Sequence, residues 1–120
     1  ISQDKAELDA GPFGAYQPVY SPVPSTQAWH QYVLTQTYVS GSNATIKVYI
    51  DITEVSSTAN TDWWISANAS GSALGRRADS VTYGSYWNGQ ISIFRVYSEP
   101  LTTAQIETNY DAHKGRYGLS

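Results

Sequence analysis

The chain has 120 residues, a formal net charge of -3, and a composition that is 13% aromatic and 14% charged. This length suits a single domain, and the acidic balance excludes the basic surface on which nucleic acids and anionic membranes bind. No apolar run reaches the roughly 20 residues needed to cross a bilayer, so we predict no membrane span. Tyrosine is abundant and cysteine is absent, as in an all-β protein without disulfides. Because methionine and a leader-like start are also absent, we expect a piece of a longer product or a processed N-terminus.

The first 28 residues differ from the rest of the chain. Residues 1–10 are polar and predict a linker or a frayed end, and prolines are dense between residues 11 and 26. Proline at this density is incompatible with a central strand and favours extended conformations. We interpret residues 1–28 as a Pro-rich extended N-terminal segment or arm. It either packs its aromatic side chains onto the domain, the favoured interpretation, or docks on a neighbouring chain. The domain itself is predicted to span residues 29–120.

Two strands and a turn predict a β-hairpin early in the domain. Residues 29–39 have the alternation of a strand, and Ser-Gly-Ser-Asn at 40–43 has the composition of a turn. Residues 45–53 then alternate almost throughout between apolar and polar side chains. The side chains predicted to point inward are Ile46, Val48, Ile50 and Ile52, and those predicted to point outward are Lys47, Tyr49, Asp51 and Thr53.

A long polar stretch follows the hairpin. Residues 54–62 predict a connection, and Trp-Trp-Ile-Ser-Ala at 63–67 predicts a short strand that carries two large aromatic side chains. Residues 68–83 are mostly small and polar and predict a long loop. Because long loops in compact domains are commonly functional or mobile, we expect a binding site in this part of the chain.

A turn and a strand are predicted next. Asn88-Gly89 tolerates positive φ and favours a tight turn. Residues 91–97 are apolar on both faces, which predicts a central strand inside a sandwich rather than an edge strand. Pro100 ends that strand.

The chain closes with a predicted helix over residues 103–113. Thr102 and Gln105 have the spacing of a capping box, which marks the start of a helix. Ile106 and Tyr110 lie one turn apart and predict its inner face. Gly115 is the predicted C′ residue at its end.

These motifs, in this order, resemble the concanavalin A-like lectin/glucanase superfamily, and within it the laminin G-like domains. In that family a Trp-His strand pairs with a strand that reads roughly Tyr-Val-Asp-Gly, and an Asn-Gly-x-Ile strand leads through a Leu corner into a short helix. The resemblance implies an all-β fold, an antiparallel β-sandwich of the concanavalin A-like jelly-roll type with one short C-terminal α-helix. The motifs are Trp-His-Gln-Tyr-Val at 29–33, Thr-Ile-Lys-Val-Tyr-Ile-Asp at 45–51, Trp-Asn-Gly-Gln-Ile-Ser-Ile-Phe-Arg-Val-Tyr at 87–97 and Pro-Leu-Thr-Thr-Ala-Gln-Ile at 100–106.

The chain departs from the family pattern in two places. A Pro-rich segment stands where strands usually precede the Trp-His element, so we expect a sandwich that is incomplete or is completed by sequence outside this chain. Ile52 stands where the family often has Gly after the Asp, so we expect Ile52 to extend its strand. The ending at 109–118 is similar to the tails of such domains in phage and large-virus structural proteins.

The superfamily includes glucanases, which makes paired carboxylates the first chemistry to test. A retaining glycosidase needs two carboxyl groups about 5 Å apart. The nearest candidates, Asp51 and Glu54, are three residues apart and face opposite sides of a regular strand. No second carboxylate stands two or four residues from either. We therefore predict a protein without enzymatic activity.

We predict no cofactor and assign no metal ligand. His30 and His113 lack the spacing of a metal-binding motif, and His30 is interpreted as a packed or edge residue of its strand. Calcium remains an open alternative, because the superfamily binds it through loop carboxylates. Asp62 and Asp79 lie in predicted loops, but neither has the dense acidic neighbourhood that tight calcium binding requires.

Sugar binding would use aromatic platforms, so the aromatic residues near the predicted loops are the candidates. Trp87 adjoins a predicted core strand and is expected to be buried with it. Adjacent tryptophans in an extended segment point to opposite sides, so one of the rings at 63 and 64 is expected to be exposed. The predicted ligand-binding residues are Trp63, Trp64, Tyr83 and Tyr86.

We predict a non-catalytic recognition or structural module of a virion or another extracellular assembly, of the decoration or fibre type, that also binds carbohydrate. Its expected partners are glycans or other proteins of the assembly, and we expect a homo-oligomer or a part of a larger assembly. Two alternatives stay open. One is a fragment of a glucan-active glycoside hydrolase whose catalytic strand lies outside this chain. The other is a purely architectural capsid protein that binds no sugar.

Overall fold

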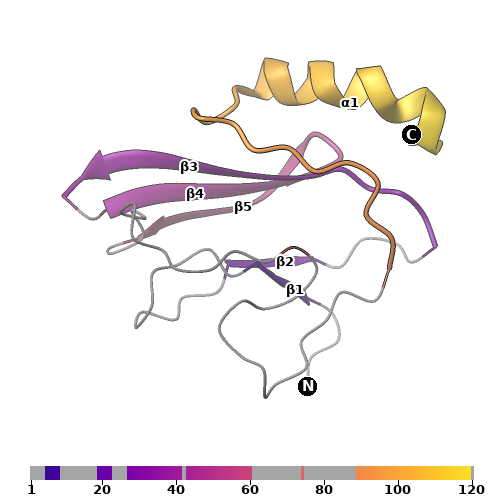
Figure 1. Ribbon diagram of the computed structural model, residues 1–120. Coiled ribbons are helices and arrows are strands. Elements are labelled where there is room, and N and C mark those ends of the chain that lie inside the picture. The colour runs from indigo at the N-terminus through magenta and orange to yellow at the C-terminus, as the bar shows by residue number, and fades with distance from the viewer. Residues whose placement is uncertain are drawn as a thin grey trace.

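The computed structural model describes residues 5–8, 19–22, 27–41, 43–60, 74 and 89–119. Within them the chain forms a three-stranded sheet, a two-stranded sheet and a C-terminal helix. Figure 1 shows the three-stranded sheet as a layer between the helix on one side and the two-stranded sheet on the other. The elements are β1 (Lys5–Leu8), β2 (Val19–Pro22), β3 (Tyr32–Ser40), β4 (Asn43–Ile50), β5 (Thr53–Asn60) and α1 (Thr103–Tyr117).

Both sheets are antiparallel. β3, β4 and β5 form a meander in which each strand pairs with its neighbour in sequence. β1 pairs with β2, and β2 contacts β5. The antiparallel β architecture and the C-terminal helix agree with the predicted fold class. A second sheet as wide as the first is not seen among the described residues, so the closed sandwich stays a prediction.

The predicted hairpin is confirmed as β3 and β4. Gly41 lies in the turn with a φ of 58°, a conformation that glycine adopts without the steric cost of a Cβ atom. The backbone N–H of Gly41 donates to the hydroxyl oxygen of Tyr38 at 3.0 Å, which ties the turn to the preceding strand. β3 begins at Tyr32 rather than at residue 29.

β4 supplies the apolar core of the described sheet. Its alternate residues Ala44, Ile46 and Val48 are at most 1% exposed, and Val55 of β5 packs against them. Burying a valine or isoleucine side chain fully stabilises a fold by roughly 1.5–3 kcal/mol, so this row is a large contribution. The inward positions predicted for Ile46, Val48 and Ile50 are confirmed.

The opposite face of the sheet is buried as well. Tyr49 lies on the face predicted to be outward, yet it is only 5% exposed, and Thr35 of β3 is 6% exposed. Residues that pair across antiparallel strands share a face, and Thr35 pairs with Lys47, which lies two positions before Tyr49 on β4. The sheet therefore buries side chains on both faces, as an inner layer with cover on each side.

The β4–β5 turn corrects the prediction for Ile52. β4 ends at Ile50, which pairs with Thr53, and the loop between them consists of Asp51 and Ile52 with φ values of 47° and 67°. Two consecutive positive φ values are typical of the type I′ turn, whose twist suits a hairpin. Ile52 therefore turns the chain instead of extending the strand, and its side chain is 37% exposed instead of inward.

The central strand predicted at 91–97 is also wrong. These residues form no strand, and their large side chains are exposed, Phe94 at 64% and Val96 at 80%. The segment instead runs alongside α1, as Figure 1 shows in orange, and is attached to it by side-chain hydrogen bonds. An apolar pattern favours a strand, but a strand also needs a partner. The described strands β3 to β5 pair only with one another.

α1 confirms the predicted capping box and inner face. The Thr102 hydroxyl accepts a hydrogen bond from the Gln105 backbone N–H, and the Gln105 side chain accepts one from the Thr102 N–H. This reciprocal pair satisfies two donors that a helix start otherwise leaves free. Ile106 and Tyr110 are both buried, at 0% and 4% exposure.

The end of α1 lies beyond the predicted one. The helix passes through Gly115 and ends at Tyr117, because Gly118 adopts the left-handed conformation that closes the last turn, with a φ of 65°. The Gly118 N–H donates to the carbonyl of Lys114. In the described part of the chain, no helix combines the length and the apolar character needed to span a membrane.

The N-terminal stretch contains two short strands. Lys5–Leu8, where a linker or a frayed end was expected, forms β1 and pairs with β2 from within the Pro-rich region. The pairing places Lys5 opposite Pro22, at the end of the ladder, a position where proline is tolerated. The division into an arm of 1–28 and a domain of 29–120 stays a prediction.

Candidate functional site

The predicted ligand-binding residues lie outside the part of the chain that the structure describes. This applies to Trp63, Trp64, Tyr83 and Tyr86, and likewise to the loop carboxylates at 62 and 79. The sugar site and the calcium alternative therefore stay predictions. The described residues bring together two other polar groups.

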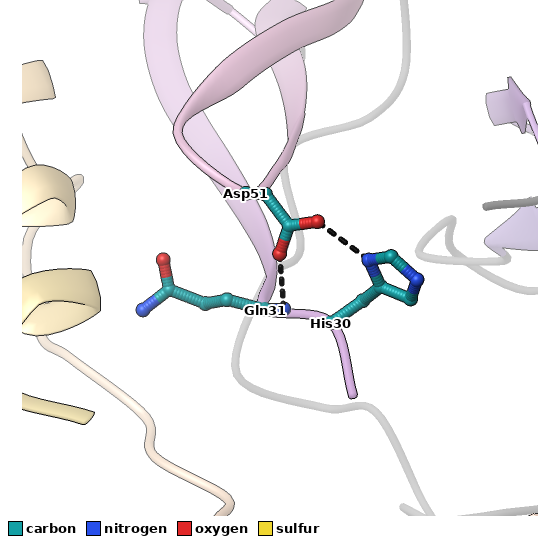
Figure 2. Close-up of polar contacts among 3 residues, drawn as sticks. All are labelled: His30, Gln31 and Asp51. Carbon is teal, nitrogen blue, oxygen red and sulfur yellow. Dashed lines mark hydrogen bonds and ion pairs between the residues drawn. The ribbon is translucent and has the colours of Figure 1, made fainter. Parts of the chain in front are cut away.

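The first polar group consists of His30, Gln31 and Asp51 (Figure 2). Oδ2 of Asp51 lies 2.5 Å from Nδ1 of His30, and Oδ1 accepts a hydrogen bond of 2.9 Å from the Gln31 backbone N–H. Because an ionised carboxylate only accepts, the imidazole donates through Nδ1. The side chains of His30 and Asp51 are mostly buried, at 16% and 26% exposure. The group joins the residues before β3 to the β4–β5 turn.

The backbone explains why the group forms at this point. The Asp51 N–H donates to the Gln31 carbonyl at 3.0 Å, while the Asp51 carboxylate accepts from the Gln31 N–H. Tyr32 pairs with Ile50 in the ladder, so Gln31 and Asp51 form the next rung, in which a carboxylate replaces a backbone carbonyl. Aspartate also tolerates positive φ better than most residues. The hydrogen bonds of Asp51 therefore stabilise a turn that has isoleucine at its second position.

The surroundings of Asp51 change the ionisation of a neighbouring tyrosine. Burial raises the pKa of the Tyr32 phenol above its ordinary value of 10.0, and the negative charge of Asp51 raises it further.

The side-chain oxygen Oε1 of Gln31 is buried and has no hydrogen-bond partner among the described residues. An unsatisfied buried acceptor costs about 1–3 kcal/mol, so a further donor at this oxygen would be stabilising.

The His30–Asp51 pair is a structural contact that connects two segments of the chain. In a catalytic triad, by contrast, the aspartate carboxylate orients the imidazole of a histidine that acts as a base. Here the second carboxylate oxygen binds the main chain of Gln31, and Asp51 is itself part of a tight turn. Both oxygens of Asp51 thus hold two distant chain segments together.

Glu54, the other carboxylate considered for glycoside hydrolysis, is engaged too. Its Oε2 accepts hydrogen bonds from Nζ of Lys47 at 2.9 Å and from the Tyr49 hydroxyl at 3.3 Å. The hydrogen bond to Glu54, together with the negative charge of Glu54, raises the pKa of Lys47. Asp51 and Glu54 therefore have different partners: Asp51 binds residues before β3, and Glu54 binds side chains of β4.

The two histidines lie in separate environments. His30 donates to Asp51, whereas His113 on α1 accepts a hydrogen bond of 2.9 Å from Arg95, because a guanidinium can only donate. Across the described ranges, no cluster of three or more His, Cys, Asp or Glu side chains is placed to hold a metal ion. The expectation that the protein uses no cofactor stays a prediction.

The second polar group joins the segment before α1 to the helix. Oγ of Ser92 lies 2.6 Å from the Tyr117 hydroxyl, and Arg95 donates to Oδ1 of Asn109 at 3.3 Å. Asn109 in turn donates to the Tyr97 hydroxyl at 3.2 Å. The segment therefore runs antiparallel to α1 and is held at several points along its length.

Sequence reasoning missed the His30–Asp51 pair. It placed Asp51 on the outward face of a strand and gave His30 no partner. The family resemblance contained the signal, because it pairs a Trp-His strand with a strand that ends in Asp. Trp29, the other member of that motif, also makes a long-range contact, with 5.2 Å between its ring centroid and that of Tyr117.

A family model described as the concanavalin A-like lectin/glucanases superfamily, of the laminin G type, matches residues 7–107. The chain belongs to this family. The match confirms the family and the concanavalin A-like fold inferred from the motifs. Laminin G-like domains are generally non-catalytic, lectin-like modules. No match was found among curated proteins or among solved structures, and the similarity to phage and viral proteins stays a prediction.

The laminin G match also includes β2, which lies within the Pro-rich stretch. The family pattern therefore begins ahead of the Trp-His motif. The segment at 91–97 and the start of α1, residues 103–107, fall inside the match as well.

Proposed function

We propose that this laminin G-like chain is a non-catalytic recognition or structural module of a virion or another extracellular assembly, and that it binds carbohydrate. The proposed ligand-binding residues are Trp63, Trp64, Tyr83 and Tyr86. The partners are glycans or other proteins of the assembly, in a homo-oligomer or a larger assembly. Neither a metal nor another cofactor takes part.

The main observation in favour of a non-catalytic protein is that both carboxylates of the β4–β5 hairpin are engaged in hydrogen bonds. Asp51 binds His30 and the Gln31 main chain, and Glu54 binds Lys47 and Tyr49. A glycosidase needs one carboxyl group poised as an acid and a second as nucleophile or base. The hydrogen bonds of both carboxylates within and next to the β4–β5 hairpin support a structural role for them instead. The general character of laminin G-like domains supports the same conclusion.

The carbohydrate part rests on the family and on the aromatic residues of the loop region. A lectin-like module recognises sugars by stacking them on aromatic faces and by a few directed hydrogen bonds. Trp63 and Trp64 are adjacent, so in an extended segment one ring faces away from the domain. Tyr83 and Tyr86 add hydroxyl groups to the same loop region.

A glycan array tests the carbohydrate proposal. We expect wild type to bind one class of glycan, and Trp63→Ala with Trp64→Ala to lose at least about tenfold in affinity, the effect of roughly 1.4 kcal/mol. Trp29→Ala is the matched control, because Trp29 is 37% exposed and lies outside the proposed patch, so its signal is expected to persist. Absence of any signal, or an unchanged signal in the double variant, contradicts the assignment.

The two alternatives give different results in the same samples. A purely architectural protein binds no glycan on the array, and the exposed apolar segment at 91–97 is the observation that favours this second candidate. Release of reducing sugar from a panel of glucans would contradict the non-catalytic proposal and support the hydrolase fragment.

A further inference from the structure

Arg95 attaches the stretch before α1, which we call the 91–97 segment, to the helix by two hydrogen bonds. Its guanidinium donates to Oδ1 of Asn109 at 3.3 Å and, through Nη2, to Nε2 of His113 at 2.9 Å. Asn109 and His113 are four residues apart and therefore lie on the same side of α1. Figure 1 shows the segment running along the helix. Arg95 is thus the attachment in the middle of the segment.

The contact between Arg95 and His113 requires one protonation state of the imidazole. A guanidinium has N–H donors and no acceptor, so Nε2 of His113 accepts the hydrogen bond. An imidazole accepts only when it is neutral, and its proton then lies on Nδ1. A protonated imidazole has donors at both nitrogens and a positive charge, so it cannot accept from Arg95 and repels it. The contact therefore exists only while His113 is neutral.

The groups around this contact do not offset a positive charge on His113. The carboxylate nearest to His113 along α1, that of Asp111, pairs with Lys114 at 2.7 Å. Arg116 lies 5.3 Å from the centroid of the Tyr117 ring, and that ring lies 6.4 Å from the ring of His113. In the described structure, no carboxylate forms an ion pair with His113. The charged or titratable groups around the contact are Arg95 and Tyr97 on the segment, and Asp111, Lys114, Arg116 and Tyr117 on α1.

The other histidine of the chain responds to acid in the opposite sense. His30 donates through Nδ1 to Asp51, and it still donates there when it is protonated, since both ring nitrogens then carry a proton. A hydrogen bond between an imidazolium and a carboxylate is also stronger than one from a neutral imidazole. Mild acid therefore preserves the contact of His30 and removes that of His113.

We propose that the Arg95–His113 contact is an acid-sensitive clasp. The clasp is closed while His113 is neutral and opens when His113 gains a proton, so that mild acid loosens the 91–97 segment from α1. Imidazoles change their charge between about pH 5 and 8, whereas the hydroxyl of Ser92 and the amide of Asn109, which also join the segment to α1, do not. Opening therefore removes the attachment in the middle of the segment and adds a repulsion there.

The tautomer of His113 tests the closed clasp. At about pH 7.5, long-range proton–nitrogen NMR of the labelled protein is expected to show the His113 proton on Nδ1. Arg95→Met removes the donor, so the proton is then expected to distribute over both ring nitrogens. His30 is the internal control, because it donates from Nδ1 to Asp51 in both proteins. A wild type in which His113 carries its proton mainly on Nε2 contradicts the proposal.

Distances between two spin labels test the opening. The chain has no cysteine, so Val96→Cys and Ala112→Cys, both at exposed positions, place one label on the segment and one on α1. Pulsed electron paramagnetic resonance at about pH 7.5 is expected to show one dominant distance. At about pH 5, the ratio of molecules at other distances to molecules at the dominant distance is expected to rise at least about threefold, because a hydrogen bond is lost and a repulsion is gained.

Substitutions of His113 in the labelled protein separate its charge from other effects of acid. His113→Gln keeps a side-chain acceptor at either pH, so its two distance distributions are expected to coincide. His113→Lys is charged at either pH and has no acceptor, so it is expected to show the distribution of the open clasp already at about pH 7.5. His30→Gln is the matched control and is expected to respond to acid as the labelled wild type does.

Two results of the distance measurements overturn the proposal. One is a labelled wild type whose distances are the same at both pH values. The other is a His113→Gln variant that responds to acid as strongly as wild type, which would assign the response to another group. Thermal unfolding at both pH values establishes that each variant is folded when its distances are measured.

Discussion

β4 and the 91–97 segment carry comparable apolar patterns and reach opposite outcomes. β4 lies between two strands and buries Ile46 and Val48 completely, whereas Val96 in the segment is 80% exposed. The difference lies in their neighbours. β4 is joined to both of its partners by tight turns, while no described strand lies next to the segment in sequence. The local apolar pattern indicates which side chains a segment can bury. Whether they are buried depends on the strands that lie next to the segment.

The largest expected effect compares the same substitution in the two regions. Ile46→Ala leaves a cavity in the core and is expected to lower the free energy of unfolding by about 3 kcal/mol. Ile93→Ala, at a residue that is 40% exposed, is expected to cost less than about 1 kcal/mol. Urea denaturation of both variants measures the difference. Equal losses would show that the segment is packed as tightly as β4 in solution.

The anchor of the β4–β5 turn is the next target. Asp51→Ala removes the hydrogen bonds to His30 and to the Gln31 main chain, and it is expected to cost about 2 kcal/mol. Asp111→Ala is the control, since Asp111 pairs with Lys114 on the surface of α1 and such pairs contribute about 0–1 kcal/mol. A loss of stability for Asp51→Ala that is no larger than for Asp111→Ala would show that the hydrogen bonds of Asp51 do not stabilise the pairing of β4 with β5.

A substitution in the same turn is expected to stabilise the protein. Ile52 has a φ of 67°, a conformation that costs a β-branched residue roughly 1–2 kcal/mol and that glycine adopts freely. After allowance for the entropy of glycine in the unfolded chain, Ile52→Gly is expected to gain about 0.5–1 kcal/mol. Gly41→Ala, the opposite change at a φ of 58° in the other turn, is expected to lose a similar amount. Thermal melts of the two variants should move in opposite directions.

The smallest effect concerns the ionisation of Tyr32 beside the anchor. Its pKa is raised by burial and then by Asp51, so the fold favours the neutral phenol. The resulting stability is fully present below the ordinary pKa of about 10 and is lost as the pH rises through the folded value. Ultraviolet difference titration of wild type against Tyr32→Phe reports this pKa. Asp51→Asn should lower it part of the way, because burial remains; a Tyr32 that titrates at or below its ordinary pKa in wild type would contradict the assignment.

Much of the fold was predictable where the decisive chemistry is local. The hairpin of β3 and β4 follows from alternation and a Gly-containing turn, and the capping box of Thr102 and Gln105 marks the helix start. The buried row of β4 follows from its period of two. In each case the residues that determine the structure lie within a few positions of one another.

The parts that escaped prediction depend on distant partners. The tight turn at Ile52 forms against the preference of isoleucine, because Asp51 is held by a residue some twenty positions earlier. The same distance hides the His30–Asp51 pair from any local pattern. The exposed state of the 91–97 segment likewise depends on which strands lie next to it. The proposed sugar-binding residues rest on sequence and family alone.

The meander of β3, β4 and β5 has a consequence for the order in which the chain folds. Each strand pairs with the next one across a tight turn, so closing the sheet requires only short loops and little loss of chain entropy. Contacts between nearby parts of a sequence form fastest. We expect this sheet to appear early in folding, with the Trp29–Tyr117 contact, which spans most of the chain, completed last.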